Sequence, residues 1–442
     1  MKKKDTNFFK YRHLFLQLII SVFFVMDLEY ISFIQIYMKF DKNLFFSFLS
    51  QSFVVLQSII AMILITRNVI PQDFGVYTLC LTAVGLLNGF IYQPLIQSIL
   101  VFGQNDSSVL KSINGYIKFS FIPLAMSGFI LSIIGYFFQI KILSFIGLIS
   151  TIFIFDSLRN YILSILNIRK NFKKIAYVNI FGLLKPILSV LLYIFFNTVE
   201  SMLVATFLAV FINLAIACRS EIIFIIYQNS FSKEVSLKVL NYAKSILPSK
   251  LMFWAIQNFD KLSISILFGP TTLGLYAPLY NCLYQIYWFS HSSVTLYFRP
   301  YIYEKIGKEQ IQIFLRYFLL SLAMFVSIFL ITNSNIFLYL LKILIGENYQ
   351  SLFDQIWAIS LLVKLVVFIY IFEMFYLPSN KVRTLWVSQF TFGLILVFSL
   401  LFFVPSSLLD FLSRFIYTMI ALVVLLTFNP IYNLYFKKYD II

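Results

Sequence analysis

Ionisable side chains inside long apolar segments are the residues of this chain best suited to do chemistry. Four of them are cations: Arg159, Lys185, Lys261 and Lys364. A charge held within hydrocarbon is costly, so such residues usually serve a function or have a specific partner. We predict that these four cations line a cavity between two halves of the molecule, where they would bind an anionic group such as a phosphate.

Three acids occupy the same apolar segments: Asp156, Asp260 and Glu373. Asp156 and Arg159 are three residues apart and share one helix face, so we expect them to pair. Asp260 and Lys261 are adjacent and diverge by roughly 100° around a helix, so each needs its own partner. We assign the three acids a structural or coupling role. The alternative for the cations is pairing with these acids, or extension of each side chain to the membrane surface.

No pattern typical of catalysis or of metal binding accompanies these charges. Cys80, Cys218 and Cys282 lack metal-ligand spacing and are expected to be apolar packing residues. The two histidines, His13 and His291, are too few and too far apart for a metal site. We therefore expect no catalytic residue, no metal and no cofactor.

The composition assigns the chain to the membrane. Of its 442 residues, 61% are hydrophobic and 12% are charged, and the mean hydropathy is +0.90. A soluble domain carries about twice that charged fraction. The net charge of +16 comes from Lys and Arg in short connectors, which indicates attraction to an anionic membrane surface rather than to nucleic acid.

The elements that position the charges are predicted to be transmembrane helices. A helix needs roughly 20 apolar residues to cross the hydrocarbon, and about twelve segments qualify, which predicts an all-α integral membrane protein. The first six, 44–66, 74–102, 117–138, 142–165, 175–196 and 201–218, form an N-lobe over 44–218. The second six, 246–268, 273–298, 313–333, 352–377, 384–404 and 408–428, form a C-lobe over 246–428.

The connectors predict the orientation of these spans. If both termini are cytoplasmic, eighteen Lys and Arg fall in cytoplasmic connectors and four in external ones, as the positive-inside rule requires. Residues 1–43 are expected to form a cytoplasmic or interfacial extension, of which 1–37 would be dispensable if Met38 is the true start. Residues 219–245 are predicted to form an amphipathic linker on the membrane, and 429–442 a cytoplasmic tail.

Two predicted external turns indicate an internal repeat. Pro, Gly and Tyr recur at a constant offset of 199 residues, as Pro71, Gly75 and Tyr77 and as Pro270, Gly274 and Tyr276. Equivalent turns in both six-helix sets favour duplication, and hence two pseudo-symmetric lobes around a central cavity. The alternative is a common helix-start signal, because Pro suits a first turn.

Several motifs together resemble one family. They are Asn-Phe-Asp-Lys at 258–261, Leu-Phe-Gly-Pro at 267–270, Leu-Gly-Leu-Tyr at 273–276, Phe-Gly-Val-Tyr at 74–77, the basic run at 169–174 and Gly-Glu-Asn-Tyr at 346–349. Over roughly residues 44–430 the chain resembles bacterial polysaccharide (O-antigen-type) flippases. These belong to the multidrug/oligosaccharidyl-lipid/polysaccharide exporter superfamily, which also holds multidrug extruders and the lipid II flippase.

The resemblance implies alternating access by two lobes in the bacterial cytoplasmic membrane. The implied substrate is a polyprenyl-diphosphate-linked oligosaccharide, moved to the outer leaflet, and the implied partners are a polysaccharide polymerase or glycosyltransferases. Under this reading the four cations would hold the diphosphate. The face formed by Tyr276, Tyr280, Tyr284, Tyr287 and Trp288 would either stack sugar rings or pack against neighbouring helices.

Three other functions remain open at this point. An ion-coupled multidrug extruder of the same superfamily would use an acidic cavity for organic cations, whereas the buried charges here lean cationic. A membrane polysaccharide polymerase or glycosyltransferase would need a sizeable external loop, but the connectors at 197–200 and 269–272 are short. A lipid II flippase generally has two further spans after the twelfth.

Overall fold

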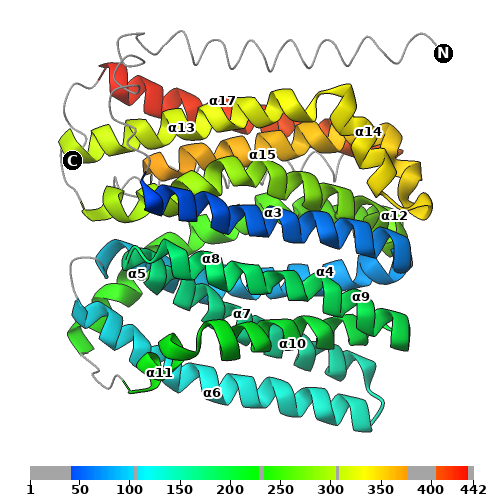
Figure 1. The fold of residues 1–442 in the computed structure, drawn as a ribbon, viewed down its shortest axis with the longest axis horizontal. Helices are drawn as coiled ribbons and strands as arrows, with labels where there is room; N and C mark the ends of the chain where they lie inside the picture. Colours follow the sequence, from blue (N-terminus) through cyan, green and yellow to red (C-terminus); the bar gives the residue numbers. More distant parts are fainter. Residues whose placement is uncertain (1–40, 104–106, 228–232, 305–307, 377–404, 437–442) are drawn as a thin grey trace.

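The computed structural model describes residues 41–103, 107–227, 233–304, 308–376 and 405–436, and these are helical with no strand (Figure 1). The helices are α3 (Lys42–Asn68), α4 (Pro71–Leu87), η1 (Asn88–Tyr92), α5 (Gln93–Phe102), α6 (Ser107–Phe137), α7 (Lys141–Ile168), α8 (Phe172–Ile180), η2 (Phe181–Leu183), α9 (Leu184–Phe196), α10 (Val199–Ala217), α11 (Arg219–Tyr227), α12 (Lys233–Glu304), α13 (Lys308–Thr332), α14 (Asn335–Leu344), η3 (Glu347–Gln355), α15 (Ile356–Tyr376) and α17 (Leu408–Phe436).

The helices follow the predicted spans. Every predicted span except 384–404 coincides with a helix, and that one lies outside the described residues. Within the described ranges, eight helices are long and apolar enough to cross a membrane. Residues 1–40 and 437–442, which hold most of the N-terminal extension and the end of the tail, also lie outside the description. The predicted all-α membrane fold is confirmed.

Local sequence sets the helix ends. The Asp41 carboxylate accepts a hydrogen bond from the Asn43 backbone N–H at 2.9 Å and caps α3. Pro71 occupies the first turn of α4, where its missing N–H costs nothing. Gly269, at φ +86°, breaks α12 into the predicted seventh and eighth spans, because glycine tolerates a positive φ.

Two predicted spans contain an irregular turn. The second span passes through η1, a π-helical turn between α4 and α5. The fifth span passes through η2, a 3-10 turn between α8 and α9. Such turns free backbone groups from the regular helical pattern and are frequent at functional sites.

The helices lie side by side, with α3 packed between α12 and α8 (Figure 1). We keep the names N-lobe and C-lobe for the two predicted halves of the chain. The N-lobe, residues 42–217, contains α3 to α10, and the C-lobe, residues 233–436, contains α12 to α17. Helices α3, α4 and α5 of the N-lobe pack directly on α12 of the C-lobe. The long axes of the helices lie side by side, so the bundle has two ends. We call the end that carries Pro71 and Pro270 the Pro-turn end, and the end that carries Lys170 and Lys174 the basic end.

The described residues between the lobes, 219–227 and 233 onwards, are helical, but their helices differ in extent from the predicted linker. They form α11 and the start of α12, and α12 continues through Pro248 into the seventh span without a break before Gly269. The apolar side of this segment packs on α5: the Phe102 and Tyr242 rings are 5.2 Å apart, and Ser98 Oγ donates to the Val239 carbonyl at 3.4 Å. The first turns of α12 therefore fasten the C-lobe to the N-lobe.

Candidate translocation site

Asp260 and Lys261 lie on the first part of α12 and, as predicted, each has its own partners. The Asp260 carboxylate is fully buried and accepts a hydrogen bond from the Tyr276 hydroxyl at 2.5 Å. Lys261 Nζ donates to the Gln257 carbonyl at 3.1 Å and to Asn258 Oδ1 at 3.2 Å. These contacts join the seventh and eighth spans of the C-lobe.

Lys261 also contacts an aromatic ladder on the second part of α12. Its Nζ lies 4.6 Å from the centre of the Tyr280 ring, a distance typical of a cation–π contact. The rings of Tyr276, Tyr280, Tyr284 and Trp288 follow one another with centroid separations of 5.2, 6.0 and 5.5 Å. Tyr276 and Tyr280 are buried, whereas Tyr284 and Trp288 are half-buried. The Tyr276 and Tyr280 rings are therefore packed inside the protein, whereas the Tyr284 and Trp288 rings keep part of their surface accessible.

Lys364 lies in α15 and is enclosed by the C-lobe. Its ammonium donates to Asn333 Oδ1 at 2.9 Å and lies 4.5 Å from the Phe329 ring centre. It also lies 5.5 Å from the Tyr287 ring centre, and 4% of the residue is exposed. Glu373 is in the same helix, but its side chain falls outside the described part. Lys364 thus links α15 to α12 and to the end of α13.

The remaining predicted charges belong to the N-lobe. Arg159 and Asp156 on α7 approach to 4.0 Å, so the predicted pair exists at the outer limit of an ion pair. Asp156 also accepts from Asn88 of η1 at 3.1 Å, and Arg159 donates to Asn179 of α8 at 3.0 Å. Lys185 is half-buried in the first turn of α9.

The four predicted cations are therefore divided between the lobes. Lys261 and Lys364 both contact rings of the second part of α12, whereas Arg159 belongs to a polar network of the N-lobe. Among the described contacts none joins two of the four cations, so one shared cavity stays a prediction.

Neutral amides complete these polar clusters, and they did not appear among the predicted site residues. Asn88, Asn179, Gln257 and Asn333 each bond to a residue of a predicted charged site or of the ladder. The sequence signal for these residues was an amide side chain within an apolar span, because such a side chain usually forms a hydrogen bond to a neighbouring helix.

The repeat turns meet each other at the Pro-turn end. A Cβ added at Gly75 would lie 1.9 Å from the Pro270 carbonyl oxygen, and one added at Gly274 would lie 1.6 Å from the Pro71 oxygen. The two glycines therefore allow reciprocal backbone contact between the lobes. Tyr77 and Tyr276 instead point into their own lobes: the Tyr77 hydroxyl bonds to Thr206 at 2.7 Å and that of Tyr276 to Asp260.

The lobes also contact each other at the basic end. Lys170 Nζ lies 2.5 Å from a Glu304 carboxylate oxygen, and Gln97 donates to the Tyr303 hydroxyl at 2.7 Å. The described conformation thus has inter-lobe contacts at both ends.

Between the ends, small residues allow close approach. Gly85 and Gly89 lie against Trp254 of α12, which an added Cβ would meet at 3.3 and 3.5 Å. This close packing is the structural role that a GxxxG pattern predicts.

This fold recurs among solved transporters. A variant of the MATE transporter VcmN from Vibrio cholerae is 15% identical, with 88% of this chain and 94% of that chain aligned at a TM-score of 0.56. The eukaryotic MATE transporter AtDTX14 is 13% identical, covering 88% and 95% at a TM-score of 0.53. A MOP superfamily transporter from Pyrococcus furiosus is 13% identical, covering 89% and 95% at a TM-score of 0.55. The fold is that of a multi-pass transporter.

A family model narrows this class. The model described as "Polysaccharide biosynthesis protein" matches residues 63–354, more than half of the chain. The chain therefore belongs to this polysaccharide biosynthesis family, in agreement with the resemblance of its motifs. No curated protein matches the chain at a significant level.

Proposed function

We propose that this protein is a flippase that carries a polyprenyl-diphosphate-linked oligosaccharide across the cytoplasmic membrane. Membership of the polysaccharide biosynthesis family supports a saccharide substrate. The observation that carries the proposal is the position of Lys261, which contacts a ladder whose far members, Tyr284 and Trp288, present half-buried rings. A cation beside polar aromatic rings suits a ligand that joins a diphosphate to sugars.

In the proposed cycle the two lobes rock about the packed α3, α4 and α12. Opening the basic end would separate Lys170 from Glu304 and admit the headgroup from the cytoplasmic leaflet. Lys261, with Lys364, Lys185 and Arg159 as further candidates, would hold the diphosphate, and the ladder would contact the sugars. Opening the Pro-turn end would part the two repeat turns and release the headgroup, while the polyprenyl tail stays in lipid.

The test is depletion in a cell that makes a surface polysaccharide, followed by complementation with variants. Depletion should leave lipid-linked oligosaccharide on the cytoplasmic face, and the intact protein should restore its transfer. Lys261→Gln and Lys364→Gln should each reduce transfer at least tenfold, because a charge-assisted contact contributes about 1.5 to 3 kcal/mol. Lys244→Gln, at an exposed position of the same helix α12, is the matched control and should transfer normally. Unchanged lipid intermediates on depletion would refute the proposal.

A multidrug extruder is the second candidate, because two of the similar folds are MATE transporters. An extruder would produce new sensitivity to cationic drugs on depletion, with lipid-linked intermediates unchanged. Its transport should also depend on Asp260 and not on Lys261. The same depletion strain therefore discriminates the two functions.

A further inference from the structure

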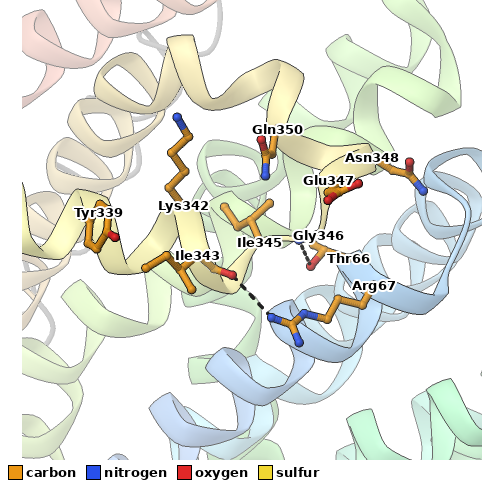
Figure 2. Close-up of a pocket in the computed structure, with 10 residues that line it drawn as sticks. All are labelled: Thr66, Arg67, Tyr339, Lys342, Ile343, Ile345, Gly346, Glu347, Asn348 and Gln350. Atoms are coloured by element: carbon orange, nitrogen blue, oxygen red, sulfur yellow. Dashed lines mark hydrogen bonds between the residues drawn. The ribbon is translucent and has the colours of Figure 1, made fainter.

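A pocket lined by both polar and apolar groups lies at the Pro-turn end, and none of its lining residues belongs to the charged clusters of the two lobes. Figure 2 shows its lining, and its volume is about 710 Å³, within the range of sites that bind small ligands. Thr66 and Arg67 come from the end of α3. Tyr339, Lys342 and Ile343 come from α14, and the rest come from the turn into η3 and from η3 itself.

The pocket is assembled from both lobes. The Gly346 backbone N–H donates to Thr66 Oγ1 at 3.0 Å, and the Tyr349 hydroxyl donates to the Val69 carbonyl at 3.0 Å. A Cβ at Gly346 would lie 2.1 Å from the Thr66 carbonyl oxygen, so the two backbones touch. Burial raises the pKa of the Tyr349 phenol, which therefore keeps its donor proton at physiological pH. These contacts fix the floor of the pocket only while this end is closed.

Five polar side chains of the lining are accessible to a ligand. Arg67, Lys342, Glu347, Asn348 and Gln350 are all exposed. Arg67 makes a long contact of 3.5 Å with the Ile343 carbonyl, and in the described part of the chain no ion pair engages Lys342 or Glu347. Two cations against one acid leave the pocket with a net positive charge, which favours an anion.

The remaining groups favour an anion attached to a sugar. A simple phosphate headgroup would use the two cations and the amide N–H groups, and it would leave the Glu347 carboxylate and the Tyr339 ring without a role. The hydroxyl groups of a sugar can form hydrogen bonds with Asn348, Gln350 and Glu347. Tyr339, which is 66% exposed, offers a ring face to the apolar side of a sugar.

We propose that this pocket binds an acidic sugar unit, such as a uronic acid or a phosphate-substituted sugar, when the Pro-turn end is closed. The choice of a saccharide rests on the proposed flippase function, but the site is separate from the clusters assigned to transport. Because the pocket needs both lobes in contact, its ligand stabilises the closed end by linkage. The end is predicted to be extracytoplasmic, so acidic sugar outside the cell would oppose its reopening.

The test is titration of digalacturonate into the purified full chain in phosphatidylcholine nanodiscs, with lactose as the neutral comparison. Digalacturonate should bind and lactose should bind at least tenfold more weakly. Lys342→Gln and Arg67→Gln should each lower the affinity for digalacturonate at least tenfold. Glu347→Gln should raise this affinity, and Lys342→Arg should leave it unchanged. Lys141→Gln, a basic residue of the same end that does not line the pocket, is the charge control.

Three outcomes would overturn the proposal. They are absence of digalacturonate binding, equal binding by the Lys342→Gln variant, and loss of binding when phosphatidylglycerol replaces the neutral lipid, which would make the pocket a lipid-headgroup site. Lys261→Gln should lose transfer yet keep digalacturonate binding. Digalacturonate binding by the intact protein, together with unchanged lipid-linked intermediates on its depletion, would refute the flippase proposal alone. Normal transfer by a protein that does not bind digalacturonate would refute the pocket alone.

Discussion

At the scale of single residues, the hydrogen-bond partners of the buried charges are mainly neutral groups. Asp260 bonds to a tyrosine hydroxyl, and Lys364 bonds to an amide and faces two rings. Sequence spacing correctly indicated that Asp260 and Lys261 need separate partners, because it depends only on helix geometry. It could not identify Tyr276 as the partner of Asp260, or Asn333 as the partner of Lys364, because each comes from another part of the packed lobe.

Tyr276→Phe should destabilise the protein by about 1 to 3 kcal/mol, because a buried carboxylate loses a donor that water cannot replace. Thermal unfolding of the purified protein, followed by tryptophan fluorescence, measures the effect as a lower apparent Tm. Tyr284→Phe removes a comparable hydroxyl bond, to Gln257 at 2.6 Å, from a half-buried position and should have a smaller effect. Equal decreases in apparent Tm for the two variants would show that the burial of Asp260 does not determine the loss of stability.

At the scale of the elements, the two repeat turns contact each other through their backbones. The sequence repeat predicted that they are equivalent, and the structure places them in mutual contact. Glycine is required there because a side chain on either helix would overlap the carbonyl group of the other turn. By contrast, a Cβ added at Gly85 or Gly89 would meet Trp254 at 3.3 or 3.5 Å, close to an ordinary contact distance.

Gly75→Ala should prevent full closure of the Pro-turn end, at a cost of about 1 to 3 kcal/mol from overpacking. Gly274→Ala should do the same, since its Cβ would meet the Pro71 oxygen. We expect lipid-linked oligosaccharide transfer to fall at least tenfold for both, with the protein still inserted. Gly89→Ala is the matched control: its nearest neighbour would be 3.5 Å away, so its transfer should change less than twofold. A normal rate for Gly75→Ala would disprove the closing role.

At the scale of the whole molecule, the two ends are closed by different chemistry. The Pro-turn end closes by backbone contact and by the hydrogen bonds of Thr66 and Tyr349. The basic end instead uses Lys170 with Glu304 and Gln97 with Tyr303. An exposed ion pair contributes less than about 1 kcal/mol, so the basic end should open more readily than its short distances suggest.

Cross-linking across the basic end should stop transport. Lys170→Cys with Glu304→Cys, joined by a short bifunctional thiol reagent, should abolish transfer, and reduction should restore it. The native cysteines are buried, and single-cysteine variants treated with the same reagent serve as controls. Transfer that continues while the cross-link is intact would argue against separation of the lobes at this end.

Cysteine labelling tests the predicted orientation. A cysteine at Lys173 should react with a membrane-impermeant thiol reagent only after the cells are opened, because the basic end is predicted to be cytoplasmic. A cysteine at Thr271, at the Pro-turn end, should react in intact cells. The reverse pattern would invert the predicted topology and move the acidic-sugar pocket to the cytoplasm.

The sequence by itself determined the class and the helical framework. Apolar length fixes where helices cross a bilayer, because unpaired backbone groups are too costly in lipid, and the spans up to 352–377 accordingly coincide with helices. The short helix α14 was not predicted, since ten residues are too few to signal a span. The turns η1 and η2 were also missed, because an irregular turn does not change the length of the apolar segment that contains it.

Only the tertiary structure decided which residues meet. Local spacing reaches three or four residues along a helix, whereas the contacts of Gly75 with Pro270, Gly346 with Thr66 and Lys170 with Glu304 join positions more than a hundred residues apart. The partners of the predicted cations, such as Asn179 for Arg159 and Asn333 for Lys364, are likewise a consequence of packing. The Pro-turn pocket exists because two lobes close against each other, which no pattern within one segment encodes.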